Sequence, residues 1–592
     1  MEEIKKMTTP VFLSLMFLLG VILYLNILDG GFIWDDNSII KNNLFIREWR
    51  YFTKNFTGEV CNQNIVKSLF FRPVQMFSYM VDYSFWGLKV QGYHLTNILL
   101  HILVAYLIFW LVVTLYSDKL LAYLTSLFFL IHPVHTEAVS YLSGRAESLV
   151  ALGLLLAFIS YLKYLDTKKG RYILLLGLSF SLALLSKEHA LMFPFLLLFY
   201  HYTFKRKIEL TALFVLFSLA LGYIILRFTF FRELSLGITY ADSSLGQRLP
   251  GALIAFFNYL KILFFPLDLH MVYGVKLFNF WQGRVLLGGV LLGALFIYLL
   301  KDCRQRGVGF FAVGWFLISL MPLSNVYPLN AYMAEHWLYF PSLGFFILIS
   351  RAMTLLYRRE KYRLVGVVIF ITLLLLYSYL TIKQNQYWQD PFKFYQRTLK
   401  YAPDNAVVNN NLANLYVGRG EYKFAVEVYK RAIQLDPNFL EAYRNLANIY
   451  CKTGQFTKGI DYYQKILDRK PDEVIVLYNL ATAYLKQRKY KLAQEFYEKT
   501  LNLAPNYEQA AVNLANLYYL EERYPEAIAL YLKALRLTAR DHRVYYNLAG
   551  VYEAQGNSEK ALEMYECYLE LKPKDKKVQQ KIEVIKKSLS AR

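Results

Sequence analysis

Cysteine is scarce in this chain, with four residues among 592. Cys61, Cys303, Cys451 and Cys567 lie far apart and form no Cys-x-x-Cys pair, so the sequence indicates neither a zinc site nor a disulfide framework. Acidic residues are also few: the chain has 44 Asp and Glu residues but 66 Lys and Arg residues. Many of the basic residues fall in short loops between apolar runs. That distribution orients a membrane protein and does not favour a nucleic-acid surface.

Polar residues are too few for a wholly soluble protein. The hydrophobic content is 56% and the mean hydropathy is +0.28, over a length that exceeds one ordinary domain. The chain is therefore predicted to be an integral membrane protein with a second part attached. The first apolar run, residues 11–28, lacks a small-x-small cleavage site, so we expect a retained first helix with a cytoplasmic N-terminus.

Apolar runs that reach spanning length with their flanking residues recur throughout residues 1–385. We expect eleven spans, at residues 11–28, 93–116, 120–132, 148–165, 172–186, 190–202, 210–227, 285–300, 310–323, 337–356 and 364–381. With this set, the basic loops at 163–171, 205–207, 301–306 and 358–363 all lie on the cytoplasmic side. Residues 251–265 are also apolar enough to span. Counting them would move two basic loops outside, so we assign them to the interface or to a re-entrant position.

The stretch Gly-Gly-Phe-Ile-Trp-Asp-Asp-Asn, residues 30–37, follows the first apolar run directly. Two adjacent carboxylates, Asp35 and Asp36, are energetically unfavourable near the apolar boundary of a membrane. The first interpretation is therefore that they form a functional pair. A solvated turn is the alternative, because Asp, Asn and Gly are ordinary turn residues.

The predicted topology gathers further ionisable residues on the face of the membrane that carries this stretch. They are Arg72, Asp82, His132, His135, Glu137, Arg145, Glu147, Lys187, Glu188, His189, Glu335 and His336. Each of these residues also has a purely structural interpretation. For example, the side chain of Arg145 could extend to the membrane surface, His132 could be hydrogen-bonded in the core, and Glu188 could pair with Lys187. Their convergence on one face favours a site. The spacing of His132 and His135 across a proline is weak for a metal, and a divalent metal stays open.

From residue 388 onward the hydropathy falls and a period of 34 residues begins. Asn-Leu-Ala recurs at Asn411, Asn445, Asn479, Asn513 and Asn547, and proline, tyrosine and small residues keep the same step. This pattern is typical of tetratricopeptide repeats. It predicts five repeats over residues 404–573, preceded by a connecting helix, or partial repeat, in 386–403 and followed by a capping helix in 574–592.

A second asparagine follows three residues later in three of the repeats, at Asn414, Asn448 and Asn516. Residues i and i+3 share a helix face, and the first helices of such repeats line the concave groove. We call these eight residues the asparagine ladder. One interpretation is that their amides hold an extended peptide by its backbone. The alternative is that they solvate the groove or contact the neighbouring repeat.

The combination resembles the transmembrane and tetratricopeptide repeat-containing O-mannosyltransferases, and more broadly the GT-C glycosyltransferases that use polyprenyl-phosphate sugars. The resemblance rests on Phe-Ile-Trp-Asp-Asp-Asn (32–37), Phe-Arg-Pro (71–73), Gly-Tyr-His (92–94), His-Pro-Val-His-Thr-Glu (132–137), Gly-Arg-Ala-Glu (144–147), Ser-Lys-Glu (186–188), Ala-Glu (334–335) and Leu-Tyr-Phe-Pro-Ser (338–342). These motifs keep the family order over nearly the whole chain. His189 and the small number of repeats depart from the family pattern and leave the acceptor open.

The resemblance implies an all-α protein in which residues 1–385 form a multi-pass GT-C-type domain with about eleven membrane helices, followed by a tetratricopeptide α-solenoid. It implies transfer of a sugar, with mannose suggested by the nearest relatives, from a polyprenyl-phosphate donor to a hydroxyl acceptor. We expect that acceptor to be Ser or Thr of a polypeptide held by extracytoplasmic repeats. The membrane would be a bacterial inner membrane, with the repeats in the periplasm, or the endoplasmic reticulum, with the repeats in its lumen.

Such chemistry needs a carboxylate that takes the hydroxyl proton and cations that hold the departing phosphate. We assign catalysis to Asp35 and Asp36, with one as base and the other orienting the site, because adjacent residues project in different directions. Asp35 is favoured as base because it matches the first acidic residue of the family motif. The predicted phosphate ligands are Arg72, Arg145, Lys187 and His189. The supporting polar residues are His132, His135, Glu137, Glu147, Glu188 and Glu335, the last orienting the site or binding a metal.

Three other functions remain possible at the level of sequence. A membrane-anchored scaffold would use the repeats alone, but an anchor needs one helix and no clustered charges. A transporter would be expected to show paired broken helices in two matching halves, which the sequence does not show. The same transferase acting on a glycan or a lipid is the third alternative.

Overall fold

The computed structural model describes residues 8–56, 59–62, 64–67, 71–230, 243–274, 276–302, 306–538 and 541–590, with the backbone alone at 59–62, 64–67 and 230. The chain divides into two compact units, Met1–Pro403 and Asp404–Arg592. Cys303 lies outside the described residues, as do Ala539, which takes the place of proline in the 34-residue pattern, and Lys5 and Lys6, which precede the first apolar run.

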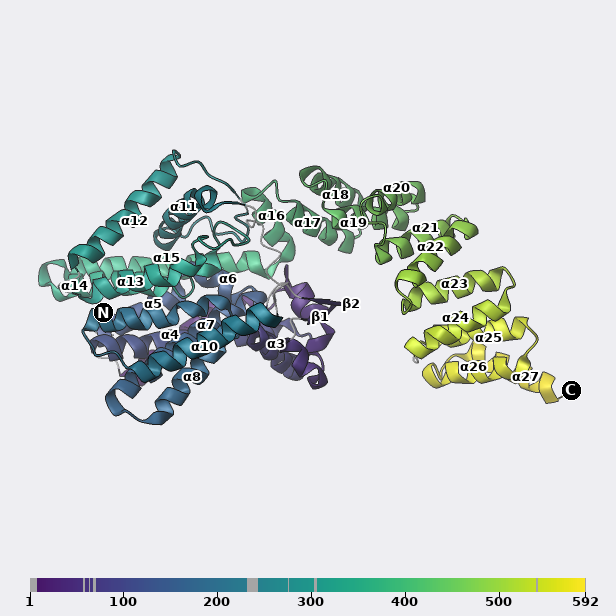
Figure 1. Ribbon diagram of the computed structural model, residues 1–592, viewed down its shortest axis with the longest axis horizontal. Helices are drawn as coiled ribbons and strands as arrows, with labels where there is room; N and C mark the ends of the chain where they lie inside the picture. The colour runs from purple at the N-terminus through teal and green to yellow at the C-terminus, as the bar shows by residue number, and fades with distance from the viewer. Residues whose placement is uncertain are drawn as a thin grey trace. The chain divides into compact units, whose positions relative to one another are not determined.

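The first unit is built almost entirely of helices (Figure 1). Its longer helices are α2 (Thr9–Tyr24), α3 (Pro73–Trp86), α4 (Val90–Tyr116), α5 (Lys119–Ile131), α7 (Arg145–Thr167), α8 (Gly170–Leu184), α9 (Phe193–Phe204), α10 (Leu210–Phe230), α11 (Leu245–Phe264), α12 (Gly283–Asp302), α13 (Val308–Leu320), α14 (Ser342–Arg358), α15 (Arg363–Gln389) and α16 (Pro391–Tyr401). The strands β1 (Glu59–Asn62) and β2 (Asn64–Lys67) form a small antiparallel hairpin in which Val60 pairs with Val66. The all-α prediction is thus confirmed apart from this hairpin.

Six stretches of the described residues are long and apolar enough to cross a membrane: Thr9–Ile27, Val90–Tyr116, Leu142–Thr167, Leu210–Thr229, Gly283–Asp302 and Glu360–Gln389. Each of the other five predicted runs also contains a helix, but these helices, such as α5 and α9, are shorter. The count of eleven spans therefore stays a prediction. Residues 251–264 lie in α11, a helix of 20 residues with Pro250 in its interior, and Phe265 is its C-cap.

The membrane helices pack closely because small residues stand at their crossings. A methyl group at Gly153 of α7 would come within 2.7 Å of the Ser179 carbonyl oxygen in α8, and one at Gly344 of α14 within 2.3 Å of the Ala312 oxygen in α13. Small residues allow this approach between helices that gain little from hydrophobic burial in lipid. In Figure 1, α4 lies beside α5 and α7, and α5 lies beside α15.

Short helices between the membrane helices carry part of the candidate site, namely His135, Glu137, Glu188, His189, Glu335 and His336. The short helices are η5 (Pro133–His135), α6 (Thr136–Val139), η6 (Leu142–Gly144), η7 (Glu188–Met192) and η10 (Glu335–Leu338). Among them, η5, α6 and η10 contact one another, and α6 also contacts η6. The predicted apolar run at 337–356 is therefore interrupted, since its first residues belong to η10 and the membrane helix α14 begins only at Ser342.

The predicted end of the membrane domain at residue 385 falls inside α15, which continues to Gln389. Trp388 explains the continuation, because its ring is buried and stacks on Tyr141 with 5.6 Å between ring centroids. Phe394 of α16 also packs against Trp388, at 5.0 Å. Both α16 and the end of α15 belong to the first unit.

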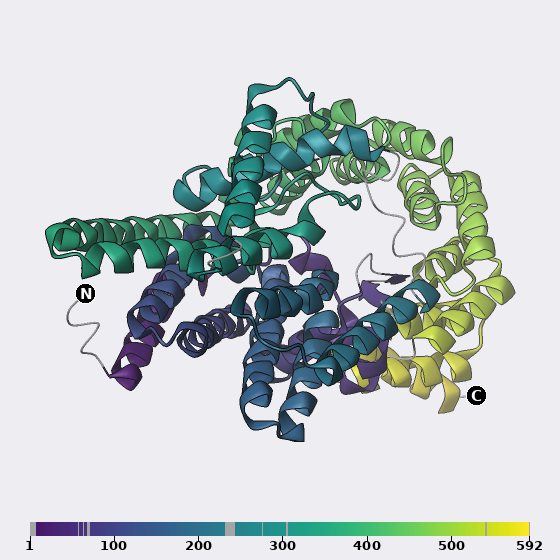
Figure 2. The same ribbon diagram turned by 60° about the vertical axis from the view of Figure 1, so that its left-hand side comes forward.

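The second unit is a stack of helix pairs, which Figures 1 and 2 show in chain order from green to yellow. The pairs are α17 (Ala406–Gly418) with α18 (Tyr422–Leu435), α19 (Leu440–Lys452) with α20 (Phe456–Leu467), α21 (Val474–Lys486) with α22 (Tyr490–Leu503), α23 (Glu508–Leu520) with α24 (Tyr524–Leu537), and α25 (His542–Ala554) with α26 (Ser558–Leu571); α27 (Lys576–Ser590) follows. The periodic Tyr429, Tyr463, Tyr497, Tyr531 and Tyr565 are buried between the helices, as the tetratricopeptide pattern predicts.

Candidate functional site

The loop after α2 holds Asp36 in the interior of the first unit, with 1% of its surface exposed. Its Oδ1 accepts hydrogen bonds from the Ser143 backbone nitrogen at 2.9 Å and from the Ser143 hydroxyl at 2.5 Å. Its Oδ2 accepts from the Ile33 nitrogen at 3.1 Å. Burial raises the pKa of Asp36 to about 7, against these three bonds, which favour the charged form. Asp36 therefore fastens the loop to η6, directly before α7, and positions its neighbour Asp35.

Asp35 is the more accessible of the two carboxylates, since its side chain is half-buried. Its backbone nitrogen donates to the Tyr141 hydroxyl at 3.3 Å. Burial raises the pKa of Asp35, while the charge of Arg72 and the Tyr141 hydroxyl lower it. Trp34, directly before it, has a φ of 54°, a left-handed conformation that few residues other than glycine adopt. This turn lies directly before the two carboxylates, Asp35 and Asp36.

Glu147, in the first turn of α7, is surrounded by three basic side chains. Lys187 donates from Nζ to Oε1 of Glu147, and both side chains are buried. The Nε2 atom of His189 lies 3.5 Å from Oε2, and Nε2 of His336 lies 3.9 Å from Oε1. Burial lowers the pKa of His189 to about 4, although Glu147 raises it. Removal of one member of such a buried pair leaves an uncompensated charge, which is strongly destabilising.

Glu137 of α6 extends this group through His336. Its Oε1 accepts from Nδ1 of His336 at 2.8 Å, and its Oε2 accepts from the His336 backbone nitrogen at 2.8 Å. His336 is 26% exposed and thus the outermost of the side chains around Glu147. Sequence reasoning placed His336 on this face but gave it no role. Its position beside Glu335, within one family motif, was the available signal.

Glu335 turns away from its neighbour. Its Oε1 accepts from the His270 backbone nitrogen at 2.5 Å and from the Tyr273 hydroxyl at 2.6 Å. Burial raises the pKa of Glu335, and the nearby charge of Glu137 raises it further. Sequence reasoning missed Tyr273, because no motif precedes or follows it.

Glu188 belongs to a second group of charges, beside the first. Its Oε2 lies 3.5 Å from Nη1 of Arg227, which also donates to the Tyr223 hydroxyl at 3.2 Å. Burial raises the pKa of Glu188, but the charges of Arg72, Arg227 and Lys187 bring it down to about 2. Arg72 thus acts on both Glu188 and Asp35. Arg227 was missed because, from sequence alone, it is only a basic residue near the end of an apolar run.

Arg145 lies in a separate, fully buried network. Its guanidinium pairs with Asp82 at 2.6 Å and donates to the side chains of Asn97 and Ser78, at 2.6 and 3.0 Å. A further bond reaches the Tyr93 carbonyl oxygen at 3.0 Å. Both the charge and most N–H groups of Arg145 are therefore committed to the packing of α3, α4 and α7. Its predicted phosphate contact stays a prediction that this geometry does not favour.

His132 and His135 also point into the core. His132 contacts the Leu263 carbonyl oxygen at 3.0 Å through Nε2, and His135 contacts the Phe129 oxygen at 2.8 Å and the Ser342 hydroxyl at 3.0 Å. Burial lowers the pKa of the His135 imidazole. The two histidines hold the turn that places Glu137. Within the described residues, no group of three or more His, Cys, Asp or Glu side chains is arranged to hold a metal ion.

In the second unit, the asparagine ladder connects successive repeats. The first asparagine of a repeat donates from Nδ2 to Oδ1 of the second asparagine in the preceding repeat: Asn445 to Asn414 at 3.4 Å, Asn479 to Asn448 at 3.2 Å, and Asn547 to Asn516 at 3.0 Å. Each of these acceptors also accepts from the periodic tyrosine of its own repeat, namely Tyr429, Tyr463 or Tyr531. Asn513 instead donates to Tyr478 and Tyr497, and Asn411 accepts from Asn410. Contact with the neighbouring repeat, the structural alternative, is therefore present.

These bonds use one N–H group of Asn479 and of Asn547, while Asn513 donates two hydrogen bonds and Asn445 donates to Asn410, at 3.0 Å, as well as to Asn414. An amide side chain has two N–H donors and an oxygen that accepts two bonds. The remaining capacity of the side chain is what a polypeptide backbone in the groove would use. The ladder is thus both a link between repeats and a candidate peptide-binding row.

Comparison with known families identifies the repeats directly. A family described as "Tetratricopeptide repeat" matches residues 438–506 and 507–574, and one described as "TPR repeat" matches residues 413–454. Among solved structures, the chain is similar to YrrB, described as a TPR protein with an unusual peptide-binding site. The two are 22% identical, and the match covers 31% of this chain and 96% of YrrB with a TM-score of 0.28.

Curated relatives match about two thirds of the chain. They include Protein O-mannosyl-transferase F38B6.6 of Caenorhabditis elegans, 28% identical over 70% of this chain and 61% of the relative, and Protein O-mannosyl-transferase TMTC1 of Homo sapiens, 28% identical over 67% and 52%. Protein O-mannosyl-transferase TMTC3 of Homo sapiens is 24% identical over 68% and 49%. The chain thus spans about half to three fifths of the length of these relatives. These matches show that the chain is similar to protein O-mannosyl-transferases over about two thirds of its length and that its second unit contains tetratricopeptide repeats.

Proposed function

We propose that this chain is a GT-C-type membrane glycosyltransferase that moves mannose from a polyprenyl-phosphate donor to a Ser or Thr hydroxyl of a polypeptide. The observation that carries the proposal is Asp35, a half-buried carboxylate on a loop anchored by its neighbour and facing the charge of Arg72. The names of the relatives, protein O-mannosyl-transferases, support the reaction class.

The reaction is a displacement at the anomeric carbon of the sugar. The acceptor oxygen forms a bond to that carbon while Asp35 takes the hydroxyl proton. The bond from the carbon to the phosphate oxygen breaks, and its electron pair leaves with the polyprenyl phosphate. A positioned general base contributes roughly 10²–10⁴-fold to such a step.

Cations around the same loop would stabilise the departing phosphate. Arg72 is the best placed, because its charge already acts on Asp35 and on Glu188. Lys187 and His189 stand next to Glu188 in the chain and meet Glu147. Arg145, which is neutralised by Asp82, would position α4 and α7 without touching the donor.

The test uses the full chain reconstituted in lipid, with polyprenyl-phosphate mannose, glucose and galactose as donors and a Ser/Thr-containing peptide as acceptor. We expect transfer from the mannose donor, measured by the mass of the peptide. Asp35→Asn should abolish it, and Asp29→Asn should not, because Asp29 lies exposed in the same loop. No transfer from any of the donors would favour a membrane scaffold, and transfer to a lipid or glycan alone would reject the polypeptide acceptor.

The proposal also requires the repeats and the Asp35 loop on the same, extracytoplasmic side. An odd number of spans from a cytoplasmic N-terminus has this result. A reporter enzyme that is active only outside the cytoplasm, fused after the last residue, should therefore be active. An inactive reporter, with an active cytoplasmic counterpart, would mean that α11 or another helix changes the count.

A further inference from the structure

The asparagine ladder is interrupted in the last repeat. Gly550 stands three residues after Asn547, at the position that Asn414, Asn448 and Asn516 occupy in their own repeats. A methyl group built on Gly550 would meet no atom within 4 Å. A glycine inside a helix is unfavourable by roughly 0.5–1 kcal/mol relative to alanine, so neither packing nor helix stability explains it.

Because Gly550 has no side-chain amide, the periodic tyrosine of this repeat, Tyr565, has other partners. Tyr565 donates instead to Oε2 of Glu553 at 2.9 Å and accepts from Nζ of Lys581 at 3.0 Å. Glu553 and Lys581 also pair with each other, at 3.0 Å. In the third repeat, Thr482 likewise replaces the second asparagine, but its hydroxyl bonds Tyr497 at 3.0 Å and fills the place.

A cavity of about 550 Å³ opens where the ladder stops. Gly550, Asn516 and Asn547 line it, together with tyrosines from four helices. Tyr546 and Tyr519 stand half-exposed in this lining, 41% and 37% accessible. Tyr546 packs against Tyr565 with 5.8 Å between ring centroids in an edge-to-face arrangement.

We propose that this cavity is a subsite for one aromatic side chain of the acceptor polypeptide, whose backbone is held by the neighbouring ladder amides. The inference rests on the proposed function, because it assumes that the groove binds polypeptide. Tyrosine rings receive another ring in edge-to-face or offset contacts with centroids 4.5–7 Å apart. A charged side chain is disfavoured, since Glu553 and Lys581 neutralise each other.

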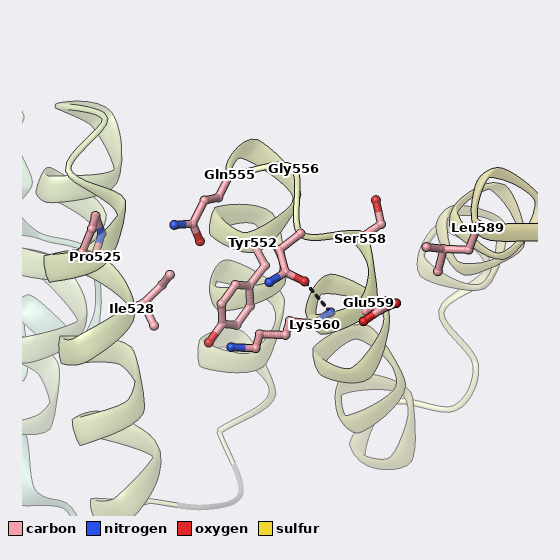
Figure 3. A pocket seen from close by; sticks show the side chains of 10 residues that line it. Pro525, Ile528, Tyr552, Gln555, Gly556, Ser558, Glu559, Lys560 and Leu589 are labelled. Carbon is pink, nitrogen blue, oxygen red and sulfur yellow. Dashed lines mark hydrogen bonds between the residues drawn. The ribbon is translucent and has the colours of Figure 1, made fainter. Parts of the chain in front are cut away.

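A larger cavity, about 880 Å³, lies at the turn between α25 and α26 (Figure 3). It is lined by Gln555, Ser558, Glu559 and other residues of that turn, by Pro525 and Ile528 of α24 and by Leu589 of α27. No ladder asparagine lines it. It therefore provides a control surface within the same repeats, and Gln555→Ala is a suitable control variant there.

The experiment measures binding of fluorescein-labelled decapeptides of Gly, Ser and Thr that carry one guest residue: Ala, Phe, Tyr, Lys or Glu. With the full chain in lipid nanodiscs, we expect the Phe and Tyr peptides to bind roughly tenfold more tightly than the Ala peptide, the order expected for aromatic contacts. Gly550→Asn, which restores the ladder and fills the cavity, should reduce this difference to less than twofold. Thr482→Asn and Gln555→Ala should leave it unchanged.

Folding of the Gly550→Asn variant is checked by its melting temperature, which should equal or exceed that of the parent because asparagine replaces a helical glycine. Gly550→Ala, which keeps most of the cavity, should retain the aromatic preference. Equal binding of all five peptides, a preference for Lys or Glu, or an aromatic preference that survives Gly550→Asn would each overturn the subsite while leaving the proposed function standing. No binding of any peptide would overturn both the subsite and the peptide-binding role of the repeats.

Discussion

The polar residues of the two units are organised in opposite ways. In the membrane unit they are charged, buried and brought together from distant segments: Glu137 and His336 are separated by 199 positions, and Asp36 and Ser143 by 107. In the repeats, the asparagine ladder consists of neutral, part-exposed amides, three pairs of which are bonded at a separation of 31 positions, from one repeat to the next.

This difference indicates in which unit a single substitution has a large effect on stability. A buried charge has few alternative partners. Removal of its partner therefore lowers the stability strongly and affects the other charges of the group. A ladder amide at the surface exchanges its bond for one with water, so its removal has a small and local effect. The following predictions test this contrast, from the largest expected effect to the smallest.

Asp35→Asn should reduce sugar transfer by roughly 10²–10⁴-fold, the usual contribution of a general base. Asparagine keeps the shape of aspartate but does not take a proton near neutral pH, so insertion and folding should persist. Transfer rates of the reconstituted variant, beside those of Asp29→Asn, measure the effect. Wild-type transfer by Asp35→Asn would remove the catalytic assignment of the loop.

Lys187→Met should destabilise the membrane unit by roughly 3–5 kcal/mol, because it leaves Glu147 buried without its closest cation. The matched control is Lys168→Met, which breaks the exposed pair with Glu209 and should cost less than about 1 kcal/mol. Unfolding in a denaturing detergent, followed by tryptophan fluorescence, compares the two. Equal costs would mean that the Glu147 group is solvated.

Asp36 should make the stability of the first unit depend on pH. Its native pKa of about 7 lies above the ordinary value of 3.8, so the native state holds a proton that the unfolded chain releases. This contribution is present below about pH 4 and is lost as the pH rises through 7, by at most roughly 4 kcal/mol at 1.36 kcal/mol per pKa unit. Asp36→Asn should flatten the profile in melting experiments between pH 4 and 8. A profile that keeps its slope in Asp36→Asn would assign the titration to another group.

The ladder should respond in small, separate steps. Asn479→Ala removes the hydrogen bond to Asn448 and should cost roughly 1 kcal/mol of repeat stability. Replacement of Asn411, Asn445, Asn479, Asn513 and Asn547 together by alanine should leave the repeats folded. It should weaken polypeptide binding by about 1 kcal/mol for each amide hydrogen bond to the peptide that is removed. Circular dichroism and peptide binding separate the two effects. Unchanged affinity would leave the ladder as a link between repeats alone.

The sequence predicted the second unit better than the first. The 34-residue period places the buried Tyr429, Tyr463, Tyr497, Tyr531 and Tyr565 and the first asparagine of each repeat, because each repeat contacts only its neighbours. The period did not show that the first asparagines donate hydrogen bonds to the preceding repeat. In the membrane unit, the runs of apolar residues located the helices, and the short polar motifs located the loops that carry the charged groups.

By itself the sequence determined the helical character of both units, the repeat and the position of Asp35 and Asp36 at the end of the first apolar run, since these depend on local composition and period. The tertiary structure decided which polar side chains meet. It turned His132 and His135 into the core, committed Arg145 to Asp82, and brought His336 and Arg227 into the charged groups. The reason is that a side chain's partner in a buried group is set by the packing of segments far apart in the chain, which no local pattern records.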